Sequence, residues 1–334
     1  MDAFVLAGDR GQSRKVRGVN KAFLMLDGRP LFLHVLVALS GARAIARIYI
    51  IGPKRQIEAA IAASPPNTAS SKWIVLEQKQ TLLENALWAY DISLQDRTGQ
   101  DRTGQDDPPA LFLSADIPLV TTQEIESFIA QADMDQADYC LGVTPDHCLA
   151  PFYPAPHRPG IRMAYLYLRD RAYRISNLHL VRPHRIGAVE YIQRAYDVRH
   201  QKQVTNLLKT LWALFRASSW FSGVRLYLLA RCAGWFSKMG IAFLAAACRN
   251  LLPACAVEAT LSRFLQARVR MVEVNMGGSA IDVDDDATYA TLSLRYAEWR
   301  NGMMRGASAY VAIRPVVPIA SALRRSKIGE SPSR

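Results

Sequence analysis

The chain has 334 residues, 50% of them hydrophobic, and its 41 lysines and arginines outnumber its 29 acidic residues to give a formal net charge of +12. This composition excludes a disordered chain, a collagen-like chain and a small disulfide scaffold. The five cysteines form no Cys-x-x-Cys pair, which argues against a structural metal or a disulfide framework, and their odd number suits a reducing compartment. The opening residues MDAFVLAG lack the pattern of a secretory signal, so we expect a cytoplasmic protein.

The charge is unevenly distributed along the chain. Residues 1–150 hold 14 basic and 18 acidic residues, a net charge of −4, whereas residues 151–334 hold 27 and 11, a net charge of +16. Such an asymmetry is typical of a surface for nucleic acid, for anionic lipid or for a phosphorylated ligand. The basic half carries no zinc-finger, helix-turn-helix or RNA-recognition motif, so we expect no nucleic-acid partner.

Short apolar segments alternate with amphipathic ones through the first half. The predicted strands are 3–7, 47–52, 72–76, 110–114 and 137–143, and the predicted helices are 30–41, 56–63, 82–90 and 123–131. Strands that are apolar on both faces and alternate with helices are typical of an α/β fold with a mostly parallel sheet. Residues 95–106 repeat a charged five-residue unit, and we expect them to form a mobile surface loop.

A second composition begins near residue 204. Residues 204–268 read as four consecutive amphipathic helices whose apolar faces are wide and aromatic, with Arg and Lys interrupting every stretch. Because no uncharged run reaches about 18 residues, a transmembrane span is not predicted. We expect a packed helical subdomain; the alternative is that these helices lie on a membrane surface. From about Arg305 the chain is expected to be a flexible basic extension.

Three groups of residues carry candidate chemistry. A glycine-bearing loop with Gly8 and Gly11 leaves the first strand, which allows backbone N–H groups to approach a phosphate; a surface turn is the alternative. Asp116 follows the strand 110–114 and is suited to hold Mg²⁺ for a triphosphate, or to cap the next turn. Four aspartates at 282–286 precede a helix, where alternation puts Asp282 and Asp284 on one side and leaves Asp285 or Asp286 as the cap.

The order of these features resembles the sugar-phosphate and cofactor nucleotidyltransferases of the molybdenum-cofactor guanylyltransferase-like type. That family opens with Leu-Ala-Gly-Gly-x-Gly-x-Arg, then Lys-Ala-Leu, then Gly-(Lys/Arg)-Pro before a hydrophobic residue. The matching residues here are Leu6, Ala7, Gly8, Gly11, Arg14, Lys21, Ala22, Phe23 and 28–31.

Later motifs of the family are matched as well. Its strand-end Asp-x-Pro corresponds to Asp116 and Pro118, and its late Asp-x-Asp before a helix corresponds to Asp282 and Asp284. Residues 81–86 resemble the helix start beside the nucleotide base, with Asn85 as the candidate contact, and 171–183 resemble an acceptor-side strand that carries Asn177. The similarity covers residues 1–150 and 270–295.

The resemblance implies a Rossmann-like fold of the GT-A type, in which the phosphate of an acceptor attacks the α-phosphorus of an NTP and pyrophosphate leaves. Positioning and charge neutralisation would dominate catalysis, because a phosphate nucleophile is already ionised. It implies Lys21, Arg14 and Asp116 as catalytic residues and Asp116, Asp282 and Asp284 as ligands of Mg²⁺. The implied nucleotide contacts are Leu6, Ala7, Gly8, Gly11, Lys21 and Asn85, and the implied acceptor contacts are Asn177 and Arg162.

Two departures from the family pattern bear on activity. Asp9 stands where the second glycine is expected, and an extra residue separates Gly11 from Arg14. Either the loop is reshaped, with Arg10, Lys15 or Arg17 as a repositioned cation, or catalysis is impaired.

The leading hypothesis is therefore a Mg²⁺-dependent nucleotidyltransferase that activates a phosphorylated small molecule. The alternatives are a molybdopterin nucleotidyltransferase and a catalytically weakened protein that binds nucleotide or a membrane surface through 204–268. We divide the chain into a core at 1–200, a helical insertion at 201–270, the end of the core with the aspartate-rich motif at 271–303, and a flexible basic tail at 304–334.

Overall fold

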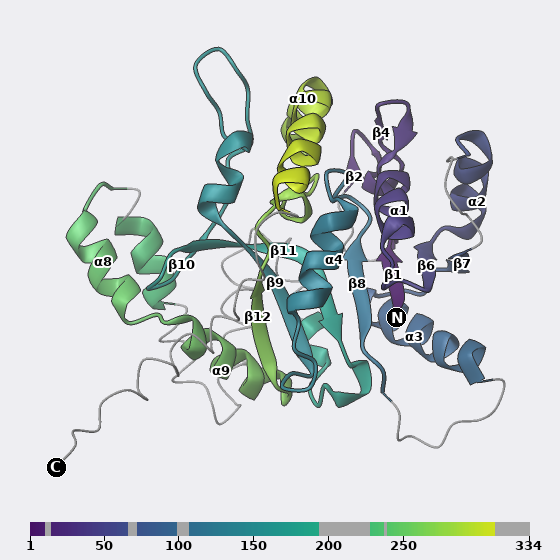
Figure 1. Ribbon diagram of the computed structural model, residues 1–334, viewed down its shortest axis with the longest axis horizontal. Coiled ribbons are helices and arrows are strands. Elements are labelled where there is room, and N and C mark those ends of the chain that lie inside the picture. The colour runs from purple at the N-terminus through teal and green to yellow at the C-terminus, as the bar shows by residue number, and fades with distance from the viewer. Residues whose placement is uncertain (11–14, 66–71, 99–106, 194–227, 237–238, 311–334) are drawn as a thin grey trace.

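The computed structural model describes residues 1–10, 15–65, 72–98, 107–193, 228–236 and 239–310 (Figure 1). The strands are β1 Asp2–Leu6, β2 Lys15–Val16, β3 Val19–Asn20, β4 Met25–Leu26, β5 Arg29–Pro30, β6 Arg47–Gly52, β7 Trp73–Glu77, β8 Ala110–Ser114, β9 Tyr139–Pro145, β10 Leu166–Tyr167, β11 Ala172–Val181 and β12 Val269–Glu273. The α-helices are α1 Leu31–Gly41, α2 Lys54–Ala63, α3 Leu82–Thr98, α4 Thr122–Gln131, α8 Ala242–Asn250, α9 Ala254–Leu265 and α10 Asp286–Tyr310. Short 3-10 turns are η1 Lys21–Phe23, η3 Asp146–Phe152, η4 Pro183–Arg185 and η5 Gly278–Ala280.

The centre of the molecule is an eight-stranded sheet in the order β12-β9-β11-β8-β1-β6-β7, with β10 paired to β11. The pairs of β1 with β6 and β8, of β6 with β7 and of β9 with β12 are parallel. Strand β11 runs antiparallel to both of its neighbours, β8 and β9. The predicted α/β class with a mostly parallel sheet is confirmed.

Helices cover both faces of this sheet. Side chains of α1 and α4 pack with Ala3, Val5 and Leu113 on one face. Phe4 and Phe112, which alternate with those residues along β1 and β8, pack with α3 on the other face, and α9 packs against β9 and β12 on that second face. Strands covered on both sides must be apolar on both sides, which is the pattern the sequence carries.

The structure corrects several expected boundaries. Helix α3 continues to Thr98, into the repeat that was expected to form a loop, and Asp96 there accepts a hydrogen bond from the Tyr49 hydroxyl at 2.9 Å. Helix α10 continues past Arg305 to Tyr310, because its inner face is anchored by packing of Trp299 and Met303 in a core cluster. Residues 99–106 and 311–334 lie outside the described part.

Two kinds of strand were not predicted. Residues 15–30, which follow the glycine-bearing loop, form two small hairpins, β2-β3 and β4-β5, whose strands are too short to show an alternating pattern. Strand β12 was not predicted, and the expected end of the helical insertion at residue 270 falls within it. Its pairing with β9 makes it an edge strand of the main sheet. Its alternation of one exposed residue, Arg270, between buried ones is short, and only the partner strand makes it decisive.

The expected helical segment is described in part. Residues 228–236, α8 and α9 are helical, whereas the first of the four expected helices lies outside the described residues. In Figure 1, α8 lies at one end of the molecule and α2 at the other. Within the described residues, no single helix is long and apolar enough to cross a membrane; α8 and α9 pass that test only as a pair, bent by 54° at their break.

Candidate active site

The site begins where two neighbouring parallel strands end. Leu6 of β1 is in register with Ser114 of β8, so the residues that follow each strand emerge at the same edge of the sheet. Asp116 lies just beyond β8, and its carboxylate accepts a hydrogen bond from the Ser114 hydroxyl. The backbone carbonyl of Asp116 accepts from the N–H of Val283 at 3.1 Å, which brings the aspartate-rich segment to this edge.

Lys21 lies between two of the predicted carboxylates. Its Nζ is 3.4 Å from Asp116 Oδ2 and 3.1 Å from Asp284 Oδ1. Burial alone would lower the pKa of Lys21, but Asp116 and Asp284 outweigh burial and raise it, so the ammonium group stays charged. The turn that carries it is fixed by Asn20, which accepts from Ala22 N at 3.0 Å and donates to the Ala7 carbonyl at 2.9 Å.

Asp282 has a different cation. Arg174 of β11 donates from Nη2 to Asp282 Oδ1 at 2.6 Å and from Nε to the Ala280 carbonyl at 2.6 Å. The fork of one guanidinium thus holds both the backbone and a carboxylate of the same loop. Asp285 caps α10 by accepting from Thr288 N at 2.8 Å, so the expected division of roles within the aspartate run is observed at that residue.

Several charged side chains of the site are largely buried. Burial raises the pKa of the Asp116 carboxyl; Lys21 opposes the rise, while the nearby charges of Asp282 and Asp284 add to it. Three carboxylates therefore share one edge of the sheet with two cationic side chains, Lys21 and Arg174. With three carboxylates and two cations, the group has an excess of negative charge, which would attract a further cation.

Donor chemistry at this edge fits Mg²⁺. Among the described residues, no group of three or more His, Cys, Asp and Glu side chains is arranged to hold a metal ion by itself. Mg²⁺ in nucleotide enzymes is usually held by only one or two carboxylates, with substrate phosphates and water as the remaining ligands. Asp116 and Asp282 are the candidates for such carboxylates, because the bond from Val283 N to the Asp116 carbonyl brings their two segments together, with Asp284 beside them.

The loop after β1 is held by the end of β7. The Asp9 N–H donates to Gln78 Oε1 at 2.8 Å, and Gln78 Nε2 donates back to Asp9 Oδ1 at 2.5 Å. Arg10 donates to the Gln78 carbonyl at 3.1 Å. The Asp9 carboxylate, which departs from the family pattern, is therefore engaged by an amide. At Gly8, an added Cβ would come within 3.1 Å of Gln78 Oε1 and 3.6 Å of Asn85 Nδ2, so this backbone is closely approached.

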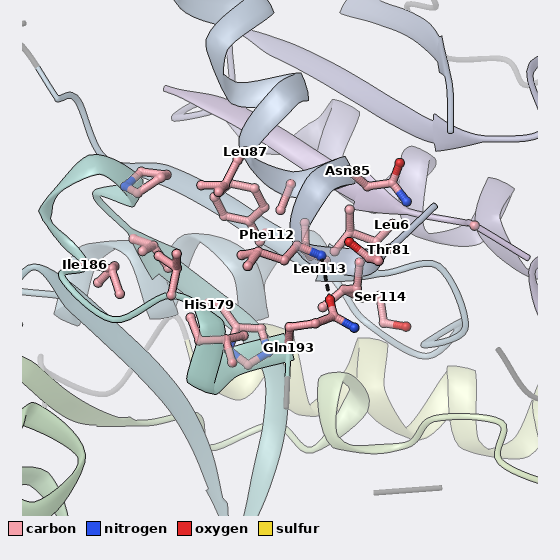
Figure 2. A pocket seen from close by; sticks show the side chains of 18 of the residues that line it. Leu6, Thr81, Asn85, Leu87, Phe112, Leu113, Ser114, His179, Ile186 and Gln193 are labelled. Atoms are coloured by element: carbon pink, nitrogen blue, oxygen red, sulfur yellow. Dashed lines mark hydrogen bonds between the residues drawn. The ribbon is translucent and has the colours of Figure 1, made fainter. Parts of the chain in front are cut away.

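A cavity of about 540 Å³ opens beside these groups, on the α3 face of the sheet (Figure 2). Its floor is formed by β8 and β11 and its walls by α3 and by residues 183–193. Gln193 Oε1 accepts from the Leu83 N–H at 3.0 Å, which joins the two walls. A cavity of this size and lining is typical of a small-molecule site.

The structure brings most of the predicted site residues together. Lys21, Asp116 and Asp284 are in direct contact, and Asp282 is next to them. Leu6, Gly8, Asn85 and Asn177 line the cavity. Ala7, between Leu6 and Gly8 in the chain, is buried. Asn177 Nδ2 also donates to the Ser279 carbonyl at 3.1 Å.

One of the remaining predicted residues, Arg162, is not at this site. Arg162 lines a different hollow, together with Tyr153, Tyr165, Tyr167 and Trp235. Gly11 and Arg14 lie outside the described residues, so their roles stay predictions.

Sequence reasoning missed three residues that shape the site. Gln78 directly follows the parallel strand β7, so the rule that ligands gather at strand ends was a usable signal. Asn20, which ties the Lys21 turn to β1, matches the usual preference for Asn before a helical turn. Arg174 carries no local signal, because its carboxylate partner is 108 residues further along the chain.

Comparisons with known proteins identify a family for this chain. The model of the MobA-like NTP transferase domain matches residues 3–272. No curated protein matches the chain.

Three solved structures are similar. One is a hypothetical transferase from Thermus thermophilus, 21% identical over 85% of this chain and 96% of that chain, with a TM-score of 0.49. Another is CMP:2-keto-3-deoxy-manno-octonic acid synthetase complexed with CTP, 12% identical over 89% and 99% of the two chains, with a TM-score of 0.43. The third is 4-diphosphocytidyl-2C-methyl-D-erythritol synthase from Anaerococcus prevotii, 10% identical over 88% and 95%, with a TM-score of 0.42.

Proposed function

Because the chain belongs to the MobA-like NTP transferase family, we propose that it transfers a nucleoside monophosphate from an NTP to a phosphorylated small-molecule acceptor and releases pyrophosphate. The observation that carries this proposal is the contact of Lys21 with both Asp116 and Asp284 at the edge where β1 and β8 end, directly beside a cavity that Gly8 and Asn85 line.

The reaction is a displacement at phosphorus. An oxygen of the acceptor phosphate forms a bond to the α-phosphorus, and the bond from that phosphorus to the bridging oxygen of the β-phosphate breaks, so that pyrophosphate carries away the electron pair. No base is needed, because the attacking phosphate is ionised near neutral pH. Catalysis then depends on alignment and on compensation of negative charge.

The chain's own residues supply both. Lys21 is charged and only 14% exposed, so its ammonium would stabilise phosphate oxygens in a poorly screened environment. Gly8 lines the cavity, so its loop backbone would be within reach of a phosphate or a ribose. Asn85 is buried, its Oδ1 accepts from Lys79 N at 2.6 Å, and its Nδ2 is left facing Gly8, where it would donate to the nucleotide base.

Magnesium is the cofactor that we propose with this reaction. Asp116 and Asp282 would hold it, and when bound it would neutralise the triphosphate and favour departure of pyrophosphate. Arg174 would orient the Asp282 carboxylate toward the metal, because it binds Oδ1 of that carboxylate and the Ala280 carbonyl of the same loop.

The first test is a thermal-unfolding panel with ATP, CTP, GTP and UTP, each with and without Mg²⁺. A ligand that binds only the native state raises the unfolding temperature by mass action. We expect one nucleotide to give a Mg²⁺-dependent increase that names the donor. If none of the four changes the unfolding temperature, the proposed transfer is wrong.

The matched variant is Asp116→Asn, which keeps the shape of the side chain and its contact with Ser114. Loss of this carboxylate removes charge that the reaction needs, so we expect turnover to fall by about 10³-fold. The unfolding temperature without ligand should change little, because Lys21 loses Asp116 but keeps Asp284, and the repulsion of Asp282 and Asp284 on the Asp116 carboxylate is removed. Full turnover in the Asn variant would contradict the role assigned to Asp116.

A further inference from the structure

The cavity beside the site has two chemically different ends. In Figure 2, Asn85, Thr81 and Ser114 lie toward one side, and Leu87 and Ile186 lie toward the other, with Phe112 between them. The polar end is continuous with the charged cluster, because Ser114 both lines the cavity and donates to Asp116.

The other end offers little to a charged molecule. Leu87, Phe112 and Val181 face residues of the 183–193 segment, chiefly Ile186, Val189 and Ile192. Of the described residues that line the cavity, Arg10 alone carries a permanent charge, and its guanidinium is already engaged by Gln78 and Glu77. Tyr139 and His179 are the polar side chains beside Val181 and Phe112, and they are bonded to each other at 2.9 Å. A sugar phosphate or another strongly hydrated molecule would therefore lose more hydrogen bonds to water here than it would gain.

The residues proposed to contact the nucleotide lie at one end of the cavity only. Its polar end accounts for the residues proposed to contact the nucleotide, Gly8 and Asn85, which leaves the apolar end for the second substrate. Asn177 lies on the cavity floor and donates to the carbonyl of Ser279, three residues before Asp282. If the acceptor's phosphate lay beside Asn177, the organic part of the acceptor would reach the apolar end of the cavity.

From this arrangement, and resting on the proposed function, we infer that the acceptor is a phosphate monoester whose organic part is largely apolar. Its phosphate would lie at the polar end near Ser114 and Asn177, and its alkyl or ring portion would lie along Leu87, Phe112 and Val189. The apolar end would thus select the acceptor by burial of hydrocarbon.

The test measures binding of methyl, n-butyl and n-hexyl phosphate to the full chain by calorimetry, below the concentration at which they aggregate. Each methylene that is buried should tighten binding by about fourfold. Leu87→Gln, which makes the wall polar, and Val189→Trp, which fills the space, should each abolish most of this dependence on chain length.

Ile92→Gln is the matched control, because Ile92 is half-buried on the same helix, packs in the core beneath it and does not line the cavity. It should keep the full dependence on chain length. Equal affinity for the three phosphates, or an unchanged dependence in both Leu87→Gln and Val189→Trp, would overturn the inference.

The outcome is separable from that of the proposed transfer. If a nucleotide binds with Mg²⁺ but chain length has no effect, the apolar acceptor is wrong and the transferase proposal stands. If chain length matters and the cavity variants abolish its effect, but no nucleotide binds, the apolar site stands and the proposed transfer falls.

Discussion

At the scale of single residues, Lys21 and the carboxylates around it depend on one another for charge balance. Lys21 is only 14% exposed and lies within 3.4 Å of both Asp116 and Asp284. Removing one partner from a largely buried ion pair leaves the other charge without compensation, which is far more costly than never having buried either.

Lys21→Met should therefore lower the free energy of unfolding by about 3 kcal/mol without metal. Added Mg²⁺ should raise the unfolding temperature of this variant more than that of the unaltered protein, because the cation compensates the carboxylates that have lost Lys21. Lys54→Met is the control, since Lys54 forms only an exposed pair with Glu58. If Mg²⁺ raised the unfolding temperatures of Lys21→Met and of the unaltered protein equally, no cation would be binding at these aspartates.

Asp9 is a second residue whose effect depends on its neighbour. Its carboxylate is engaged by the Gln78 amide, so we expect Asp9→Gly to change kcat/KM for the nucleotide by less than about threefold. Gln78→Ala should lower kcat/KM by about tenfold, because the freed carboxylate would repel the phosphates. In the Gln78→Ala background, Asp9→Gly should restore activity, and additive losses in the double variant would contradict this coupling.

At the scale of elements, α4 holds the loop that presents the aspartates. Glu124 of α4 accepts from Ser279 N at 3.0 Å and from Ser279 Oγ at 2.8 Å, beneath η5. Its other oxygen is buried without a hydrogen-bond partner in the described part of the chain. Burial raises the pKa of Glu124 from 4.5 to about 7, although the bonds from Ser279 oppose that rise.

The sign of the resulting pH dependence follows from proton binding. The native state holds the Glu124 proton more tightly than the unfolded chain, so the free energy of unfolding falls as pH rises from about 4.5 to about 7. Above that range the free energy of unfolding is lower by about 3 kcal/mol. Glu124→Gln should be more stable than the unaltered protein at pH 8 and nearly equal to it at pH 4, by denaturant unfolding.

Glu58→Gln provides the comparison, because Glu58 is an exposed residue of α2 with one surface ion pair. It should follow the pH dependence of the unaltered protein. If Glu124→Gln follows it too, the pKa of Glu124 is the same in the native and unfolded states and the reasoning fails.

Element positions were predictable where the pattern is local and repeated. The strands at the centre of the sheet were found from their apolar runs, and β8 was predicted at its observed bounds. Asp116 and Lys21 followed from motif order along the chain. Strand β12 and the length of α3 were not predictable in this way, because pairing with β9 and the bond from Tyr49 to Asp96 involve residues far apart in sequence.

At the scale of the whole molecule, the positive half of the chain includes exposed apolar side chains. Phe243 of α8 is 73% exposed, and Trp235 and Met239 near it are more than half exposed. Helix α9, in contrast, packs its buried residues on β12, so deleting 204–268 would also uncover the sheet. Point substitutions at exposed positions are the cleaner test of a membrane surface.

We predict salt-sensitive sedimentation with phosphatidylserine-containing vesicles if the basic half binds a membrane surface. Phe243→Ser should weaken that binding by about tenfold, because an inserted aromatic ring contributes apolar burial. Leu294→Ser is the control, since Leu294 is 73% exposed on α10, a different helix. Indifference to vesicles, or an equal effect of both substitutions, would exclude α8 as the contact.

The sequence by itself determined the class of sheet, the strand ends that carry Asp116 and the glycine loop, and the family, because each rests on residues close together in the chain or on their order. Only the tertiary structure decided that Lys21 lies between Asp116 and Asp284, which are separated from it by 95 and 263 residues. It likewise decided that Gln78 engages Asp9, that Arg162 faces another hollow, and that the cavity has an apolar end. Local patterns record which face of an element is apolar, whereas a cavity and a charge cluster exist only where distant elements have packed.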